Sequence, residues 1–268
     1  MVFAIPDDLI HAVRAARRIA VLTGAGISAE SGVPTFRDAQ TGPSAGSGQS
    51  LWAKYDPTEL ATPEAFRRNP RLVWEWYAWR RGLVSKAQPN PGHVALVELE
   101  SHLSLAQPPA GDASRFTLIT QNVDGLHQRA GSRNIIELHG NLNRTKCFAE
   151  EVVIEGWQET GAAPPRCPRC GGLLRPDVVG FGEALPRQAL AGAVEAASTC
   201  EVFLSIGTSA LVQPAASLPY MALERGAVVV EINPDETSLT ADATCALRGP
   251  AGVVLPALLQ AAWPTRPR

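Results

Sequence analysis

The chain has 268 residues, enough for one large domain or for a core with a smaller module. Its 24 Lys and Arg residues nearly balance 26 Asp and Glu residues, so the net charge of −2 gives no electrostatic reason to expect nucleic acid or a membrane as a partner. No apolar run approaches the ~20 residues of a membrane helix. Five cysteines without a visible secretory leader favour a metal site or free thiols in the cytoplasm over a disulfide framework.

Predicted helices and short strands alternate along much of the chain. The strands are continuous apolar runs, which is typical of strands covered on both faces of a parallel sheet. The pattern predicts an α/β fold with a doubly wound, Rossmann-like parallel sheet. Helices are expected over 8–18, 93–103, 187–197 and 215–225, and strands over 19–23, 116–120, 135–138, 202–206 and 227–232.

Two stretches interrupt this alternation. Residues 41–89 form a predicted insertion of loops and helices, in which Thr62 can cap a helix that begins at Pro63. The segment 40–50, where this insertion begins, is rich in Gly, Ser and Ala and is predicted to be a loop. Residues 141–180 hold three cysteines and little periodicity, which indicates a small zinc-ribbon-type module. One domain over residues 1–268 is therefore expected, with its core at about 8–40, 90–140 and 181–260.

A glycine-rich turn follows the first predicted strand. Gly24, Ala25, Gly26 and Ser28 lie in it, and backbone N–H groups in such turns can approach a phosphate. Ala29 stands where a dinucleotide fingerprint has its third glycine, so a simple packing turn is the alternative on this motif alone. The turn leads into Phe36 and Arg37, which can stack on a ligand and face phosphates.

Polar residues also follow two other predicted strands. Gln121, Asn122, Val123 and Asp124 come directly after the strand over 116–120, and His139 ends the strand over 135–138. Because parallel strands present their carboxyl ends at one edge of the sheet, these groups should face the same crevice as the glycine turn. A histidine there is well placed to act as a general base near neutral pH.

Taken together, several motifs resemble those of the sirtuins, NAD-dependent protein lysine deacylases. They are GAGISAESGVPTFRD, TQNVDGLH, ELHGNL, GTSALVQPAA and EINPDET, in the family's order, and the resemblance runs from about residue 8 to residue 260. The chain is most similar to the bacterial-type, class III-like members.

The resemblance implies that NAD is consumed and that the acyl group ends on ADP-ribose, with nicotinamide released. In this scheme His139 deprotonates a ribose hydroxyl, while Asn122 and Asp124 position the ribose, a water or the nicotinamide. Acyl-lysine proteins or peptides are the implied partners. The implied NAD-binding residues are Gly24, Ala25, Gly26, Ser28, Phe36, Arg37, Gln121, Asn122, Val123, Asp124, Gly207, Thr208, Ser209, Asn233, Pro234, Asp235 and Ala251.

Acyl-group preference is predicted from one helix. Tyr77 and Arg80 are three residues apart and share a helical face, and an arginine beside a tyrosine hydroxyl is a natural carboxylate receptor. The pair is similar to that of class III sirtuins, which prefer succinyl, malonyl or glutaryl lysine. The alternative is an aromatic helix face in a core, with the arginines reaching solvent.

A zinc site is expected in the small module. Cys167 and Cys170 have the spacing of a zinc knuckle. The family places a second such pair upstream, but here Cys147 is followed by Glu150 at the partner position. There are three alternatives. Zinc is held by three thiolates and Glu150 or Glu151, or by three thiolates and a water molecule, or the metal has been lost. Retention of zinc is favoured over its loss. Cys200 and Cys245 are expected in the core.

Other functions remain open from the sequence. A plain lysine deacetylase or a mono-ADP-ribosyltransferase would use the same chemistry at the ribose. A nicotinamide-dependent oxidoreductase is disfavoured by the glycine spacing. A non-catalytic NAD or ADP-ribose binding module is disfavoured because His139, Asn122 and Asp124 are all present.

Overall fold

A parallel sheet organises most of the chain. The computed structural model describes residues 4–34, 56–105, 115–157, 161 and 163–264. Among these, six strands pair in parallel in the order β3-β2-β1-β6-β7-β8. The doubly wound prediction is therefore confirmed. The strands are β1 (Ile19–Thr23), β2 (Phe116–Thr120), β3 (Ile135–Glu137), β6 (Val202–Ile206), β7 (Val228–Asn233) and β8 (Cys245–Arg248).

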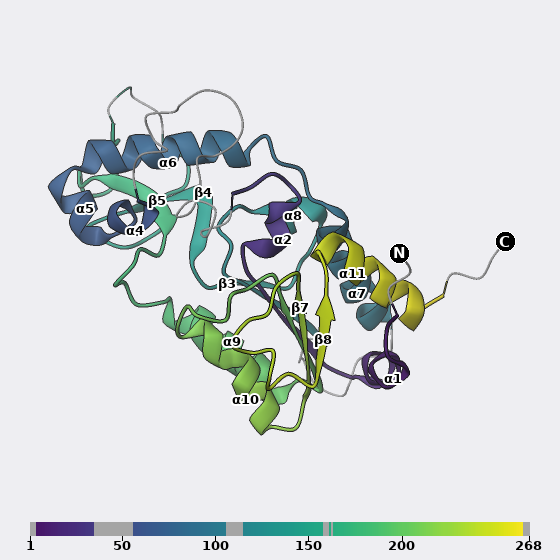
Figure 1. The fold of residues 1–268 in the computed structure, drawn as a ribbon. Coiled ribbons are helices and arrows are strands. Elements are labelled where there is room, and N and C mark those ends of the chain that lie inside the picture. The colour runs from purple at the N-terminus through teal and green to yellow at the C-terminus, as the bar shows by residue number, and fades with distance from the viewer. Residues whose placement is uncertain (1–3, 35–55, 106–114, 158–160, 162, 265–268) are drawn as a thin grey trace.

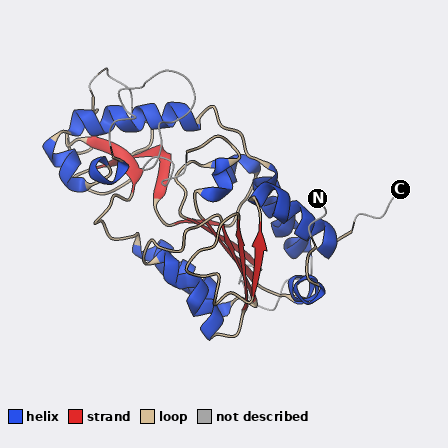
Figure 2. Cartoon of the chain, viewed as in Figure 1, coloured by secondary structure: helices blue, strands red, loops and turns tan. Residues whose placement is uncertain are grey.

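Helices cover both faces of this sheet (Figures 1 and 2). Successive residues of a strand point to opposite faces, so Val21 joins one apolar core and Leu22 joins the other. The first core is closed by α1 (Asp7–Ala15), α7 (Pro91–Leu105) and α11 (Ala251–Ala262). The second is closed by α9 (Arg187–Thr199) and α10 (Leu218–Glu224).

Several element boundaries differ from the prediction. The helix expected over 8–18 ends at Ala15 because Ala16 is extended. Strand β3 ends one residue earlier than predicted, and β7 begins and ends one residue later. The helix expected over 215–225 is a 3-10 turn, η2 (Ala215–Ser217), followed by α10, whose first turn contains a proline. Strand β8 and helix α11 were not predicted; α11 contains Pro256, a residue that usually interrupts helices.

The two stretches that interrupt the alternation pack together as one unit. Strands β4 (Gly140–Cys147) and β5 (Leu174–Val178) form a separate antiparallel sheet. Helices α4 (Pro57–Leu60), α5 (Pro63–Arg68) and α6 (Pro70–Val84) share an apolar core with it, built around Phe66, Trp76 and Leu142. The predicted cap is confirmed, since the Thr62 hydroxyl accepts a hydrogen bond of 3.0 Å from the Ala65 N–H. The predicted 40–50 loop lies outside the described residues.

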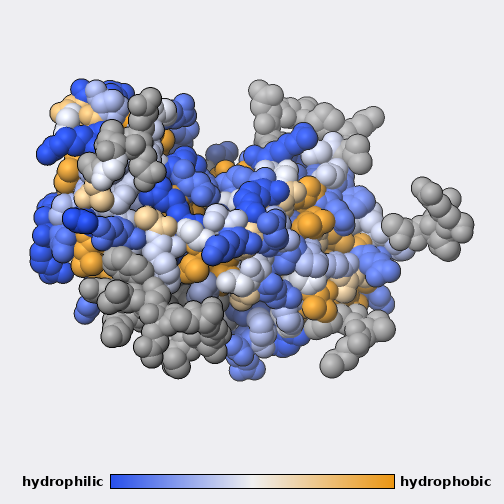
Figure 3. All heavy atoms as spheres, turned by 90° about the horizontal axis from the view of Figure 1, so that it is seen from above, coloured by the Kyte–Doolittle hydropathy of each residue, from blue (hydrophilic) through white to orange (hydrophobic). Residues whose placement is uncertain are grey.

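The surface shows no single dominant apolar area in the view from above. Over the part of that face that is described, apolar side chains form small groups among polar ones (Figure 3), which is normal for a protein surface. In the described part of the chain, no helix combines the length and the apolar character needed to cross a membrane.

Two buried histidines lie under the sheet edge where β1 and β2 end. His93 of α7 and His127 of α8 (Leu126–Ala130) have ring centroids 4.8 Å apart. Thr23 gives its hydroxyl proton to Thr120, so His127 Nε2–H must donate to the Thr23 oxygen, at 3.0 Å. Burial lowers the pKa of His93 to about 4; burial and its neighbour His93 lower the pKa of His127 to about 3. Both rings are therefore neutral at pH 7.

This pair predicts that stability falls in acid. An unfolded histidine takes up a proton near pH 6.5 whereas the buried rings do not, so the unfolded state binds more protons below that pH. We expect the free energy of unfolding to be fully retained above pH 6.5 and to fall toward pH 4, by roughly 1.4 kcal/mol per pH unit per histidine. Urea unfolding at pH 7, 6 and 5 measures this.

His93→Gln should flatten this pH dependence, whereas the control His11→Gln, at an exposed residue of α1, should leave it unchanged. An unfolding free energy that is the same at pH 7 and pH 5 in the wild-type protein would contradict the assignment.

Candidate active site

The turns after β1 and β6 meet at backbone distance. Gly26 N–H donates to Gly207 O at 2.8 Å. A Cβ atom added to Gly24 would lie 2.7 Å from Gly207 O, and one added to Gly26 would lie 2.7 Å from Gly207 Cα. Gly207 itself has φ +57, a conformation that favours glycine. Close packing of the two turns thus explains the first two glycines of the motif.

Polar side chains gather beside this contact. Ser28 lies in α2 (Gly26–Ala29) and donates to the Asp124 carboxylate at 2.7 Å. Asn122 Nδ2 donates to Gly24 O at 3.0 Å and to Ser28 Oγ at 3.2 Å. Burial raises the pKa of Asp124, although hydrogen bonds from Leu126 N–H and Ser28 oppose this. The predicted residues of the first two strand ends therefore form one hydrogen-bonded cluster.

The same edge connects to β6 and β7. Gln121 Nε2 donates to Thr208 Oγ1 at 3.0 Å, and Asn233 Nδ2 donates to Thr208 O at 2.9 Å. All described NAD-binding candidates lie at the carboxyl ends of the strands or at the start of α11 (Figure 1). Phe36 and Arg37 fall outside the described residues. The remaining candidates at this edge are Ala25, Val123, Ser209, Pro234, Asp235 and Ala251.

The glycine turn is also tied to the last helix. Glu30 follows α2, and its carboxylate accepts a hydrogen bond of 2.7 Å from Gly252 N–H in the first turn of α11. A Cβ atom at Gly252 would lie 2.9 Å from that carboxylate. Sequence reasoning missed Glu30, because an acidic residue in the motif gave no indication of a partner more than two hundred positions away.

His139 lies between the cofactor-side cluster and the second sheet. Its Nδ1–H donates to Gln121 O at 2.9 Å, which leaves Nε2 as the basic nitrogen of the neutral ring. Burial lowers the pKa of His139, and the bond to Gln121 partly opposes this. Its carbonyl accepts from Val179 N–H at 2.9 Å. The imidazole is thus fixed in the tautomer that a general base requires.

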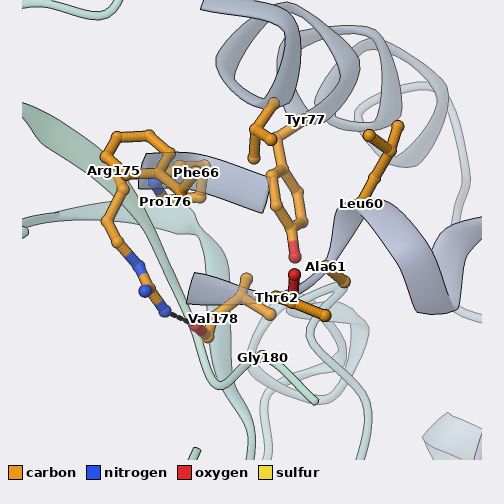
Figure 4. A pocket seen from close by; sticks show the side chains of 10 residues that line it. Leu60, Ala61, Thr62, Phe66, Tyr77, Arg175, Pro176, Val178 and Gly180 are labelled. Atoms are coloured by element: carbon orange, nitrogen blue, oxygen red, sulfur yellow. Dashed lines mark hydrogen bonds between the residues drawn. The ribbon is translucent and has the colours of Figure 1, made fainter. Parts of the chain in front are cut away.

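An apolar pocket opens between α6 and β5 (Figure 4). Tyr77 reaches into it from α6, and its hydroxyl end points toward Ala61 and Thr62. Burial raises the pKa of Tyr77 to about 12, so the hydroxyl keeps its proton and can donate it in a hydrogen bond. The other lining residues are Leu60, Phe66, Val73, Arg175, Pro176, Val178 and Gly180.

Arg80 lies one helical turn beyond Tyr77. Its guanidinium group is 4.9 Å from the centre of the Trp76 ring, and burial lowers its pKa. Arg80 and Tyr77 are also close enough to interact electrostatically. The structure therefore places the predicted tyrosine and arginine side by side on α6, but Tyr77 lines the pocket and Arg80 is not among the lining residues.

Of the residues that line the pocket, only Tyr77 was predicted from the sequence to bind substrate. Val178 and Gly180 belong to the run VVGFGE (residues 178–183), which begins at the end of the predicted metal module. An apolar pair followed by two glycines and an acid is a detectable signal of a structured turn. The residue spacing gave no reason to bring this run next to Tyr77.

The predicted metal ligands form one cluster. The sulfur atoms of Cys147, Cys167 and Cys170 and a carboxylate oxygen of Glu150 all lie within 4.8 Å of one another. Three thiolates and a carboxylate are a suitable donor set for a structural zinc ion, so the residues fit the metal. Glu150 Oε2 is also 3.2 Å from Arg169 Nε.

The remaining cysteines pack in the two cores of the main sheet. Cys200 is buried against the α9 and α10 side, and burial raises the pKa of its thiol to about 11. Cys245 is half-buried against the opposite core. Neither thiol is placed as a nucleophile, as predicted.

Comparison with known proteins assigns the family. The model of the Sir2 family matches residues 24–214. The NAD-dependent protein deacylase of Methylococcus capsulatus is 50% identical, covering 97% of this chain and 98% of its own. NAD-dependent protein deacylase 2 of Pyrobaculum aerophilum is also 50% identical, over 91% of this chain and 90% of its own.

Solved structures agree with this assignment. A Sir2 homologue in complex with NAD superposes with a TM-score of 0.81 and 44% identity, covering 97% of this chain and 94% of that one. A Sir2 complex with a p53 peptide and NAD+ has a TM-score of 0.75 and 29% identity, over 96% and 98% of the two chains. The resemblance found in the sequence motifs is thereby confirmed: this chain belongs to the Sir2, or sirtuin, family.

Proposed function

We propose that this protein is an NAD-dependent protein lysine deacylase that prefers acidic acyl groups such as succinyl and malonyl. Relatives that are half identical over nearly the whole chain carry the name NAD-dependent protein deacylase. The whole chain would act as one catalytic domain, with acyl-lysine proteins or peptides as substrates.

The position of His139 is the observation that supports the proposal most directly. Through Gln121 it is bonded to the loops that we assign to NAD, and through its own carbonyl it is bonded to the run that lines the Tyr77 pocket. In this position Nε2 of the neutral ring would be the atom that accepts a proton from a ribose hydroxyl.

NAD, when bound, supplies nicotinamide as leaving group and ADP-ribose as acyl acceptor. The residues then have separate tasks. The touching turns at Gly24, Gly26 and Gly207 would fix the backbone of the loops that bind the pyrophosphate, because each of these glycines donates its N–H to a carbonyl of a neighbouring strand or turn. Asn122 and Asp124, held by Ser28, orient groups at the nicotinamide ribose, while Thr208 and Asn233 line the adenosine side.

The acyl preference rests on Tyr77 and Arg80. An acidic acyl group carries a carboxylate, which needs charged or hydrogen-bonding donors when it leaves water. A protonated tyrosine hydroxyl and a guanidinium group supply such donors, and a guanidinium can form two parallel hydrogen bonds to one carboxylate. An acetyl group has no carboxylate to form these charge-assisted hydrogen bonds, so the pair would favour the acidic substrates.

The zinc cluster has a structural task in this scheme. Trp74 of α6 packs in one apolar cluster with Cys147 and Cys167, so metal binding would fix the orientation of the helix that carries Tyr77 and Arg80. A reducing, cytoplasmic environment is part of the proposal, because thiolates must remain reduced to bind zinc.

The acyl preference is tested with one peptide in acetyl-, malonyl-, succinyl- and glutaryl-lysine forms. Nicotinamide release gives kcat/KM for each. We expect Arg80→Met to lower kcat/KM for the succinyl peptide by about 100-fold, or ~3 kcal/mol, because an acyl carboxylate would lose its charged partner. The value for the acetyl peptide should change by less than about 3-fold.

The matched control is Arg81→Met, since Arg81 is the next residue of α6 and its guanidinium lies 5.0 Å from the Trp74 ring in a similar contact. Equal losses for acetyl and succinyl peptides in Arg80→Met would refute the acidic-acyl preference. Nicotinamide release that ignores the acyl peptide altogether would refute the deacylase assignment.

The pH profile tests His139 as the base. Its lowered pKa means that the neutral, basic ring persists below pH 6.5, so the acid limb of kcat/KM should have its midpoint below that value. His139→Gln should reduce deacylation by about 100-fold or more at pH 7.5. A midpoint at or above pH 6.5 would assign the limb to another group.

Metal analysis tests the altered zinc site. Protein purified without chelator should hold one zinc ion, and Glu150→Cys should retain zinc at higher chelator concentrations, because a fourth thiolate replaces an oxygen ligand. Titration with a chelator and mass spectrometry of the intact protein measure this. Absence of zinc from both proteins would rule out the site.

A further inference from the structure

A buried arginine and a glutamate clamp the run that follows β5. Arg175 lies on β5 and is only 7% exposed. Its guanidinium donates to Glu183 Oε1 at 2.8 Å and to the carbonyl of Val178 at 2.6 Å, and a further bond joins it to Glu183 Oε2. The same carboxylate accepts from Gly180 N–H. The pair thus closes a loop from β5 to Glu183 with four hydrogen bonds.

The clamped run, residues 178–183, touches both ends of the candidate active site. Val178 and Gly180 line the Tyr77 pocket, and Phe181 N–H donates to the carbonyl of Ala61, another pocket residue, at 2.7 Å. At the other end, Val179 N–H donates to His139 O. The run therefore connects the pocket to the backbone of His139.

The packing leaves this run little freedom. A Cβ atom at Gly180 would lie 2.8 Å from Ala61 O and 3.0 Å from the Glu183 carboxylate. The Arg175 guanidinium also lies 5.7 Å from the centre of the Phe148 ring. Figure 4 shows the Arg175 side chain alongside Phe66, with its guanidinium end at Val178. Any change in the clamp must therefore move pocket atoms.

The clamp is ionic at neutral pH. Burial alone would raise the pKa of Glu183, but the hydrogen bonds from Arg175 and Gly180 N–H outweigh it and lower that pKa. Three of the bonds use the fork of the guanidinium group, which the single ammonium of a lysine does not reproduce. Neither partner is easily replaced while the run keeps its position.

We propose that Arg175 and Glu183 are positioning residues for acyl-lysine binding, which hold the pocket wall 178–183 in register with His139. The inference rests on the proposed function, because it assigns a task to the same pocket. Neither residue needs to contact the reacting atoms, since both act through Val178, Val179 and Gly180.

The test compares Arg175→Lys, Glu183→Gln and the double variant with the wild-type protein. The steady-state KM for succinyl peptide and the KM for NAD are measured separately, with thermal unfolding as the check of folding. We expect each single variant to raise the peptide KM by about 10-fold and to change the NAD KM by less than about 2-fold. The double variant should be no worse than the worse single variant, since both remove one clamp.

Arg67→Lys is the matched control. Arg67 also lies over the Phe148 ring, at 5.5 Å, and forms an ion pair with Glu64, but both side chains of this ion pair are exposed. This variant should leave both KM values unchanged. A peptide KM that moves equally in Arg67→Lys would show that the effect is not specific to the clamp, and would overturn the proposal.

The remaining outcomes are decisive as well. Folded clamp variants with an unchanged peptide KM, or with equal increases in both KM values, would overturn the inference. If Arg175→Lys fails to fold, an unchanged peptide KM in Glu183→Gln would overturn it too. These results are separate from failure of the proposed function, in which the wild-type protein releases no nicotinamide with any acyl peptide.

Discussion

The contact between the turns after β1 and β6 is the constraint on which the candidate active site depends. The two strands are neighbours at the centre of the sheet, and the chain leaves them in different directions. The turns can pass each other only because Gly26 and Gly207 lack side chains. The turn after β1, held on this side by the turn after β6, is bonded on its other side to the turn after β2, where Asn122 donates to Gly24 O and Asp124 accepts from Ser28. The candidate site is thus built where these three turns meet.

The chain passes from one sheet to the other at the candidate base. His139 follows β3 of the parallel sheet, and Gly140 begins β4 of the antiparallel sheet. Gly140 has φ +79, and a Cβ atom there would lie 2.1 Å from Asp177 O, so the junction admits only glycine. The imidazole therefore belongs to neither sheet alone. Its Nδ1–H is bonded to the loop after β2 of the larger sheet, and the His139 carbonyl to the run after β5 of the smaller one.

Sequence patterns predicted the elements whose signal is local. Strands β1, β2 and β6 were placed to the residue because each is a continuous apolar run bounded by polar or glycine residues. Strand β8 was missed since it has four residues, one of them the exposed Ala246, and α11 since Pro256 interrupts its pattern. Residues in motifs were found, among them Glu150 at the position of the fourth metal ligand, whereas the pocket wall depends on contacts between distant segments.

The bond between Glu30 and Gly252 makes the two ends of the fold interdependent. Glu30 belongs to the glycine motif near the start of the chain, and Gly252 to the helix that completes the first apolar core. A helix start needs partners for its N–H groups, and here the partner comes from the motif itself. Displacement of the last helix would therefore remove a bonding partner from the glycine motif, although the two segments stand near opposite ends of the chain.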